Sequence, residues 1–229
     1  MTPDSASPDT SGGPSRPQDP LYYERRFWGR GALVVGVDEA GRGPLAGPVV
    51  AAAVVLPPGI EVEGADDSKK LAAPVREELH RAILASARAV GVGAASVREI
   101  DRLDILRATT RAMQRALASL DAALEASRDL QDISESPRIV IDGMPVRGLG
   151  REHEAVVDGD ALIHSVGCAS IVAKVVRDRL MRRLAARYPG YGWETNVGYG
   201  TAQHRQAIRD LGHTPHHRLS FGAQMELEL

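Results

Sequence analysis

Four acidic residues stand at the ends of segments that are typical of β-strands. Asp38 and Glu39 end the first segment, Asp142 ends a later one, and Asp160 follows a third, shorter one. In α/β proteins, ligands bind where the strands end, because side chains from neighbouring strands meet there. Carboxylates without clustered Cys or His are the ligands of a hard cation such as Mg²⁺ or Mn²⁺ rather than of zinc. The sequence therefore predicts a divalent-cation site built from these acids.

An alternative interpretation is that these acids are separate helix caps and turn formers. Adjacent residues of a strand point to opposite faces, so Asp38 and Glu39 share a site only if the strand ends there. Gly41 and Gly43 can supply the turn that ends it. Taken singly, Asp160 fits a cap or turn better than a site, whereas four acids at strand ends together favour the site.

Two short segments suit a phosphate or a hydroxyl group. Gly41, Arg42 and Gly43 form a glycine-flanked loop with one cation, and short glycine loops let backbone amides approach a ligand. This loop lacks the G-x-G-x-x-G spacing of dinucleotide-binding folds. Ser68 and Lys69 belong to a hydroxyl and ammonium cluster just before a predicted helix, which suits a phosphate but is often only a helix cap.

The elements that must position these residues alternate between strands and helices after an early strand pair, which indicates an α/β fold. Strands are predicted at residues 33–38, 49–56, 89–95, 138–143 and 155–158. Helices are predicted at residues 74–88, 165–187 and 201–211, the last closed by Gly212. Residues 125–137 are polar and are predicted to form a loop.

Side-chain spacing and capping residues mark the helices before that loop. Val75, Leu79 and Ile83 fall on one face of the helix at 74–88. Ser96 and Glu99 form a capping box that starts the next helix. One face of an amphipathic helix is formed, at spacings of three or four residues, by Leu106, Thr109, Met113, Leu117, Leu120 and Leu124.

The chain has 229 residues, of which 43% are hydrophobic and 25% charged, values that exclude a disordered chain, a collagen and a coiled-coil rod. Its longest apolar run is shorter than the ~18–20 residues of a membrane span, and no signal peptide is recognisable. Cys168 is the single cysteine, so no intrachain disulfide forms and we expect a cytoplasmic protein. Residues 1–20 are rich in Pro, Gly, Ser, Thr and Asp, which predicts a disordered tail.

Charge and aromatic residues are unevenly distributed. The formal net charge is −2, yet residues 177–219 hold eight arginines and only three acids. A basic segment beside an acidic one is typical of polyanion binding, although most charge runs are solvated helix faces. Tyr188, Tyr191, Trp193 and Tyr199 lie in the same segment, where they can stack on a sugar or base or form a small second core.

The run from Val37 to Val49 resembles a motif of the ribonuclease HII family. It includes the first two acids and the glycine loop. The resemblance extends over about residues 30–222. The other matching segments, in family order, are Asp67-Ser68-Lys69-Lys70-Leu71, Ile141-Asp142-Gly143, Gly159-Asp160, Ala169–Lys174 with Arg177-Asp178, Gly198-Tyr199-Gly200-Thr201, and His216-His217-Arg218 with Ser220-Phe221.

The resemblance implies a ribonuclease H-like fold, a five-stranded mixed sheet flanked by helices and followed by a helical C-terminal region. Residues 21–187 would form the catalytic domain and residues 188–229 the substrate-binding region. It implies an endonuclease that hydrolyses the RNA strand of RNA–DNA hybrids and cuts 5′ of single ribonucleotides in duplex DNA. The products would carry 5′-phosphate and 3′-hydroxyl ends, and the cut would serve ribonucleotide excision repair.

The resemblance also implies roles for individual residues. The family's acidic positions fall on Asp38, Glu39, Asp142 and Asp160, which would hold two Mn²⁺ or Mg²⁺ ions. Two cations about 4 Å apart can activate a water and relieve charge on the leaving oxygen. The residues implied or predicted to bind substrate are the ribonucleotide-sensing loop Gly41, Arg42 and Gly43, the junction tyrosine Tyr199, and Ser68, Lys69 and Lys174.

Two positions depart from the family pattern. Val197 stands where members often have Lys, so we expect one contact to the backbone phosphate to be missing. Cys168 lies in a run of the long helix that is alanine-rich in the family, and we interpret it as a packing residue rather than a nucleophile.

Two rival functions follow from the same residues. Another metal-dependent nuclease of this fold, such as a resolvase or integrase, would cleave all-DNA duplexes, and the loop at residues 41–43 argues against it. A binding module without activity would need defective acids, and all four are present. We expect a monomer whose partners are RNA–DNA hybrids and ribonucleotide-containing DNA; Gln224-Met225-Glu226-Leu227 faintly resembles sliding-clamp peptides.

Overall fold

A mixed five-stranded sheet forms the centre of the molecule. The computed structural model describes residues 19–65, 67–127 and 136–222. The strands are β1 (Val34–Ala40), β2 (Val49–Val55), β3 (Ala89–Ala95), β4 (Arg138–Asp142) and β5 (Glu154–Val156), in the spatial order β3-β2-β1-β4-β5. The first three pair antiparallel, whereas β4 runs parallel to both β1 and β5. This is the five-stranded mixed sheet that the family resemblance implies.

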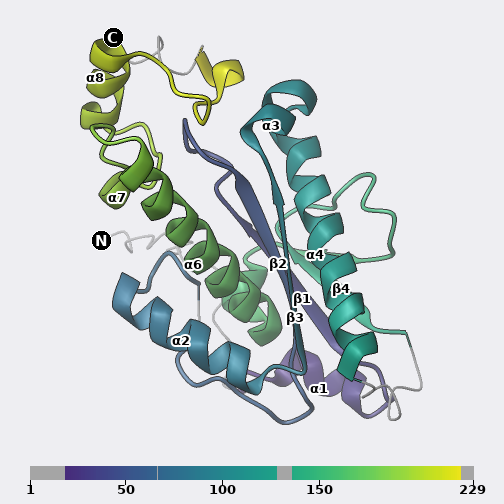
Figure 1. The fold of residues 1–229 in the computed structure, drawn as a ribbon. Coiled ribbons are helices and arrows are strands. Elements are labelled where there is room, and N and C mark those ends of the chain that lie inside the picture. The colour runs from purple at the N-terminus through teal and green to yellow at the C-terminus, as the bar shows by residue number, and fades with distance from the viewer. Residues whose placement is uncertain (1–18, 66, 128–135, 223–229) are drawn as a thin grey trace, which may run out of the picture.

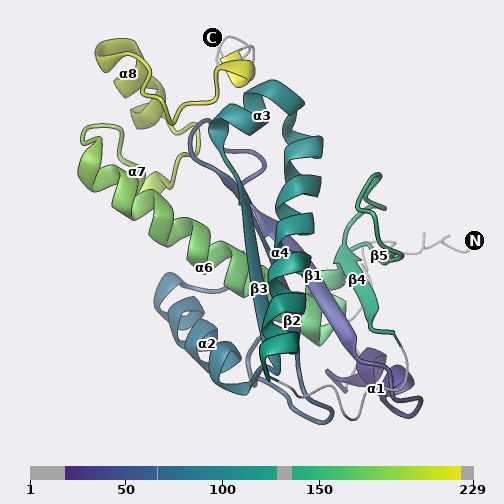
Figure 2. The same cartoon turned by 45° about the vertical axis from the view of Figure 1, so that its right-hand side comes forward.

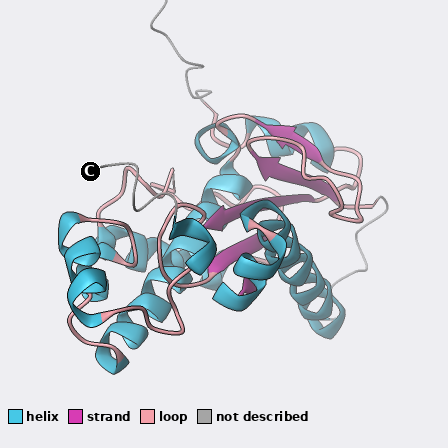
Figure 3. Cartoon of the chain, turned by 90° about the horizontal axis from the view of Figure 1, so that it is seen from above, coloured by secondary structure: helices cyan, strands magenta, loops and turns pink. Residues whose placement is uncertain are grey.

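Helices cover both faces of the sheet, as Figures 1 and 2 show and as Figure 3 shows from above. Helix α4 packs on one face, against β3 and β2, and α6 packs on the other, against β1 and β2 with α2 beside it. Alternate residues of β2 serve the two cores, because successive side chains of a strand point to opposite faces. The helices are α1 (Tyr22–Trp28), α2 (Ala73–Ser86), α3 (Val97–Leu103), α4 (Ile105–Ser127), α5 (Gly159–Leu162), α6 (His164–Arg187), α7 (Trp193–Asn196), α8 (Ala202–Leu211) and the 3₁₀ turn Leu219–Phe221.

Helix α6 approaches β1 closely because a glycine lies at the contact. A Cβ built on Gly36 would stand 2.1 Å from the backbone of Ser165 in the first turn of α6. No larger residue fits there without moving the helix. The same helix buries Cys168 completely in the core that it forms with β2 and α2. The packing role predicted for this cysteine is therefore confirmed.

Most predicted elements are confirmed, with shifted ends, and the differences have local causes. Val75 and Leu106, predicted on buried faces, are 42% and 62% exposed. At the starts of these two helices, Leu71 and Ile105 pack against the cores instead. The capping box of Ser96 and Glu99 is confirmed, but it starts only the short helix α3. Asp104 then adopts a φ of +82° and separates α3 from α4.

The C-terminal region packs against the loop between β1 and β2. Ala46 and His217 form an antiparallel bridge, and the main chain of Leu45 bonds to both Gly198 and Arg218. Trp193, fully buried, belongs to the same hydrophobic cluster as Leu45. The end of the chain is thereby brought to the strand ends that carry the acids.

The predicted tail and the clamp-like peptide fall mainly outside the described residues. Residues 1–18 and 223–229 are not among those described, nor are residues 128–135 of the predicted loop. Asp19, placed in the tail by the sequence prediction, instead accepts a hydrogen bond from the amide of Leu21 just before α1. None of the described helices is long and apolar enough to cross a membrane.

Candidate active site

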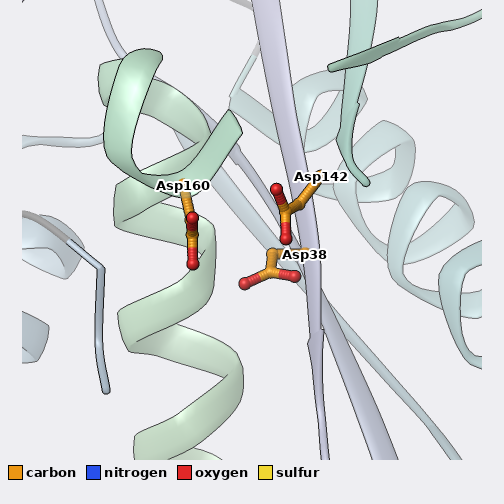
Figure 4. Close-up of side chains that lie close together, drawn as sticks. All are labelled: Asp38, Asp142 and Asp160. Carbon is orange, nitrogen blue, oxygen red and sulfur yellow. The ribbon is translucent and has the colours of Figure 1, made fainter. Parts of the chain in front are cut away.

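Asp38 and Asp142 lie side by side because two parallel strands pair in a fixed register. Val37 of β1 pairs with Ile141 of β4, so the next residue of each strand is an aspartate at the same end of the sheet. Asp160 reaches them from the first turn of α5, which follows β5, the neighbour of β4. One carboxylate oxygen from each aspartate lies within 4.8 Å of the others, and Figure 4 shows the three side chains together.

Two of these aspartates are almost fully buried. Asp38 is 4% exposed and Asp160 is 7% exposed. Burial, and then the charges of Glu39 and Asp142, raise the pKa of Asp38 well above its usual value. Burial and the charge of Asp142 likewise raise the pKa of Asp160. Clustered carboxylates of this kind are costly to ionise without a cation between them.

The donor set fits a hard divalent cation. Oδ1 of Asp142 is buried and accepts no hydrogen bond within the described part of the chain. The three grouped side chains offer only carboxylate oxygens, which suit Mg²⁺ and Mn²⁺. Among the predicted acids, the structure therefore brings three together in an arrangement that can hold a metal ion.

Glu39, the fourth predicted acid, lies outside this group of three. Its Oε1 accepts a hydrogen bond of 3.0 Å from Nη1 of Arg42, the cation of the glycine loop. Burial raises the pKa of Glu39, and the guanidinium of Arg42 opposes that shift. The carboxylate nevertheless lines the same cleft as Asp38 and Asp142.

Ser68 and Lys69 reach the acids from the segment before α2. Nζ of Lys69 donates to Oδ2 of Asp160 at 3.2 Å, while its side chain stays 73% exposed. Carboxylate charges, Asp160 foremost, raise the pKa of Lys69 against the effect of burial. Ser68 is buried, and its hydroxyl lies 2.9 Å from that of Ser170 on α6. Lys69 therefore presents a cation beside the carboxylates, whereas Ser68 is committed to an internal contact.

A cleft of about 550 Å³ runs past these groups. Tyr199 stands over it, 44% exposed, with Cε1 3.9 Å from the position of a Cβ on Gly43. Nζ of Lys174 lies 6.0 Å from the centroid of that ring and donates to Asp178 at 2.7 Å. The residues that line the cleft include every predicted site residue except Asp160: Asp38, Glu39, Gly41, Arg42, Gly43, Ser68, Lys69, Asp142, Lys174 and Tyr199. Asp160 joins the site through its contacts with Lys69 and the other aspartates.

Two buried arginines hold the glycine loop and its neighbours by their carbonyl oxygens. Arg218, 3% exposed, donates to the carbonyls of Gly41, Arg42 and Gly47. Arg177, fully buried, donates to those of Ala46, Pro48 and Val197. A Cβ on Gly41, whose φ is +96°, would stand 2.0 Å from Nε of Arg177. Glycine at this position thus permits both the turn and the close approach of the guanidinium.

Sequence reasoning missed the role of these arginines. Arg177 and Arg218 counted there toward a basic surface segment, yet both are buried in the structure. Arg179 and Arg182 of the same segment pair with Glu77 of α2. The one sequence signal for Arg177 and Arg218 is their place in the family-like motifs, where Arg177 precedes Asp178 and Arg218 follows two histidines. Several arginines of this segment therefore make contacts within the fold, and the charge of the segment is not wholly available to a polyanion.

The aromatic residues of the C-terminal region divide between the two roles that the sequence left open. Tyr191 and Trp193 are buried and stack with ring centroids 5.2 Å apart, and Tyr188 packs beside them. Tyr199 alone of the four lines the cleft. Val197, which stands where the family often has Lys, is nearly buried in the core, with φ +43° and its carbonyl bound to Arg177.

Comparison with known proteins gives consistent matches. The family model described as ribonuclease HII matches residues 35–224. A ribonuclease HII of Synechococcus sp. (strain JA-3-3Ab) is 47% identical over 215 residues, which cover 92% of this chain and 91% of that protein. The crystal structure of ribonuclease H2 from Pyrococcus horikoshii OT3 superposes with a TM-score of 0.65 at 27% identity, covering 85% of this chain and 97% of that one.

A second solved structure is that of a PCNA:RNase HII complex from Archaeoglobus fulgidus. It matches with a TM-score of 0.58 at 25% identity and covers 82% of this chain and 94% of that one. Both structural matches share the ribonuclease H-like architecture described above, which confirms the predicted fold.

Proposed function

The chain belongs to the ribonuclease HII family and is thus an endonuclease of the ribonuclease H type, and we propose that it cuts duplex DNA 5′ of single embedded ribonucleotides as well as the RNA strand of RNA–DNA hybrids. Divalent metal ions serve the reaction, and the products carry 5′-phosphate and 3′-hydroxyl ends. The observation that supports this most is the cluster of Asp38, Asp142 and Asp160 beside a cleft that the glycine loop and Tyr199 also line.

The carboxylates divide the metal-binding work among them. Asp38, Asp142 and Asp160 would hold two Mg²⁺ or Mn²⁺ ions, with Glu39 released from Arg42 to complete the ligand set. When bound, such ions supply an activated water and stabilise the leaving oxygen. Lys69, beside Asp160, keeps its ammonium charged and accessible and can contact a substrate phosphate. Lys174, paired with Asp178, places a second ammonium over the ring of Tyr199.

The glycine loop is suited to read the 2′-hydroxyl, the group that DNA lacks. In a trans peptide, the carbonyl and the amide that follows point in opposite directions. The carbonyls of Gly41 and Arg42 point to Arg218, so the amides of Arg42 and Gly43 point away from it. Because these residues line the cleft, their amides are available to a hydroxyl there.

Tyr199 is proposed to recognise the junction between ribonucleotide and DNA. Its exposed ring lies near Gly43 and lines the cleft beside the glycine loop. A ring packed on the deoxyribose 3′ of the scissile ribonucleotide supplies apolar contact, and its hydroxyl can bond to the ribonucleotide. The alternative is that Tyr199 packs the last helices together, but Tyr191 and Trp193 fill that packing role in the buried core.

One assay separates this function from its rival. A duplex with one ribonucleotide and an all-DNA duplex of the same sequence are incubated with the protein in Mg²⁺ and in Mn²⁺. We expect a single cut 5′ of the ribonucleotide and no cut in the all-DNA duplex. Equal cleavage of both would instead identify a DNA nuclease of the same fold. Binding without a cut in either metal would support a module without activity.

A sliding-clamp contact is part of the proposal. The matched structure from Archaeoglobus fulgidus is titled as a complex with PCNA, which supports a clamp as partner here. The clamp-like peptide Gln224–Leu227 lies outside the described residues. The monomeric state, the division at residues 187 and 188, the role in ribonucleotide excision repair and the cytoplasmic location stay predictions.

A further inference from the structure

A buried histidine pair lies behind Tyr199 and takes no direct part in the function proposed above. His204 is fully buried and His217 is 2% exposed. Their Nε2 atoms lie 3.1 Å apart, although no carboxylate bonds to either ring in the described chain. Neither histidine lines the cleft.

Hydrogen-bond partners assign one protonation state to each ring. Nδ1 of His204 lies 2.9 Å from the carbonyl oxygen of Tyr199, which can only accept, so Nδ1 carries a proton. Nε2 of His204 accepts from the indole N–H of Trp193 at 2.9 Å, so it carries none. The proton between the two rings therefore belongs to Nε2 of His217.

The other side of His217 agrees with this assignment. Its Nδ1 accepts from the main-chain amide of Thr214 at 2.8 Å and therefore carries no proton. Both rings are neutral and they hold opposite tautomers. A directional relay results, from the Thr214 amide through His217 and His204 to the carbonyl of Tyr199.

We propose that His204 and His217 are positioning residues, which act through this relay to hold the main chain of Tyr199 and so place its ring over the glycine loop. The flanking residues Gly198 and Gly200 give that main chain more conformational freedom than other residues would. Local bonds join the amide of Tyr199 to Asn196 and its carbonyl to the amide of Thr201, and the carbonyl of Gly198 accepts from Leu45. Nδ1 of His204 adds a side-chain donor to the Tyr199 carbonyl, so the relay ties this turn to the buried histidine pair. The effect on cleavage rests on the proposed role of Tyr199.

The first test measures the tautomers without any activity. The intact protein is labelled with ¹⁵N-histidine and its ring nitrogens are observed by NMR at neutral pH. We expect His204 protonated at Nδ1 and His217 protonated at Nε2. The same tautomer in both rings, or a positive charge on either, would overturn the relay, whatever the enzyme cleaves.

The second test uses the junction ratio, defined as kcat/KM on a single-ribonucleotide duplex divided by kcat/KM on a continuous RNA–DNA hybrid. His204→Leu should lower this ratio about tenfold, because small displacements of a positioning group cost that much or more. His204→Asn keeps a donor near the Nδ1 position and should retain most of the ratio. The exposed His213, which contacts His217 only through its ring edge, gives the control variant His213→Gln, with no change.

A double-mutant cycle links the effect to Tyr199. In a Tyr199→Ala background, His204→Leu should lower the junction ratio no further. Additive losses, or equal losses on both substrates, would show a merely structural role for the histidines. If His204→Leu does not fold, the comparison of His204→Asn with His204→Gln replaces it. The Gln amide reaches the Nε2 position and cannot donate to the carbonyl of Tyr199, so only His204→Gln should lower the junction ratio. A normal junction ratio in the single variant Tyr199→Ala would refute the junction role of Tyr199. The NMR experiment would still test the relay, because it does not depend on cleavage.

Discussion

The two sides of the cleft are built on different principles. On one side, the functional atoms belong to the side chains of Asp38, Asp142 and Asp160, and strand register alone brings the first two together. On the other, they are proposed to be main-chain amides of the glycine loop and one ring, which buried Arg177, Arg218 and the histidine pair hold from behind. We therefore propose that chemistry resides in side chains on a rigid sheet, and recognition in a backbone shaped by remote residues.

This contrast predicts that changes on the acid side abolish cleavage without harming the fold. Asp142→Asn should lower kcat/KM by about three orders of magnitude, equivalent to about 4 kcal/mol of transition-state stabilisation. The thermal midpoint without metal should hold or rise, because the charge of Asp142 raises the pKa of its neighbour Asp38. Rates at saturating Mn²⁺ and calorimetry check both statements.

The matched control for that variant is Asp158→Asn. Asp158 is exposed two residues before Asp160, and its φ of +57° suits asparagine equally well. It should keep full activity. Near-normal cleavage by Asp142→Asn would remove this residue from the metal site.

Changes behind the recognition side should cost both stability and selectivity. Arg218→Lys loses most of the bonds to the carbonyls of Gly41, Arg42 and Gly47 and leaves buried oxygens without donors. We expect a loss of about 2–4 kcal/mol of unfolding free energy and weaker cleavage of every ribonucleotide substrate. Denaturant unfolding and kcat/KM measure the two effects.

Arg209→Lys is the control for Arg218→Lys. Arg209 is exposed on α8 in the same basic segment, so the substitution keeps the charge and disturbs no carbonyl. It should change neither quantity. Equal effects of the two variants would favour a general basic surface over the anchoring of the loop.

Tyr199 should contribute less than the acids and only at junctions. Tyr199→Ala removes an exposed ring, and stacking of this kind is worth about 1–3 kcal/mol, so the junction ratio should fall about tenfold. Tyr199→Phe keeps the ring and should lose only the share of the hydroxyl. An unchanged thermal midpoint would distinguish recognition from packing, because a packing role predicts a lower midpoint and a loss on all substrates.

The smallest expected effect is a dependence of stability on pH from the histidine pair. Burial is the main cause that lowers the pKa of His217 from 6.5 to about 4, and electrostatic repulsion between its protonated form and the neighbouring imidazoles of His204 and His213 acts in the same direction. Between these values the unfolded chain binds a proton that the folded chain does not, so stability falls as pH falls from about 6.5 toward 4. His217→Gln should show a shallower fall in thermal midpoint over that range. An identical slope in both proteins would contradict the buried neutral state.

The acid side could be predicted from the sequence, because its signal is local. Asp38 and Asp142 each end a β-branched run, and neighbouring parallel strands bring such ends together. Glu39 shows the limit of that reasoning, since a sequence does not reveal that its carboxylate turns to Arg42.

The recognition side could not be predicted in the same way. Arg218 acts on Gly41 across 177 positions of sequence, through carbonyl oxygens that every residue possesses. A buried arginine and a solvated one look alike in a sequence, so Arg177 and Arg218 counted as surface charge. The helix at Tyr22–Trp28 was likewise missed, because seven residues are too few to show a helical period.

The most direct test of this division is the junction ratio of two variants, Asp142→Asn and Tyr199→Ala, measured with the same pair of substrates. We expect Asp142→Asn to lower both values of kcat/KM in proportion and to leave the ratio unchanged. We expect Tyr199→Ala to lower the ratio about tenfold while cleavage of the continuous hybrid is nearly retained. A ratio that falls in both variants, or in neither, would contradict the separation of chemistry from recognition.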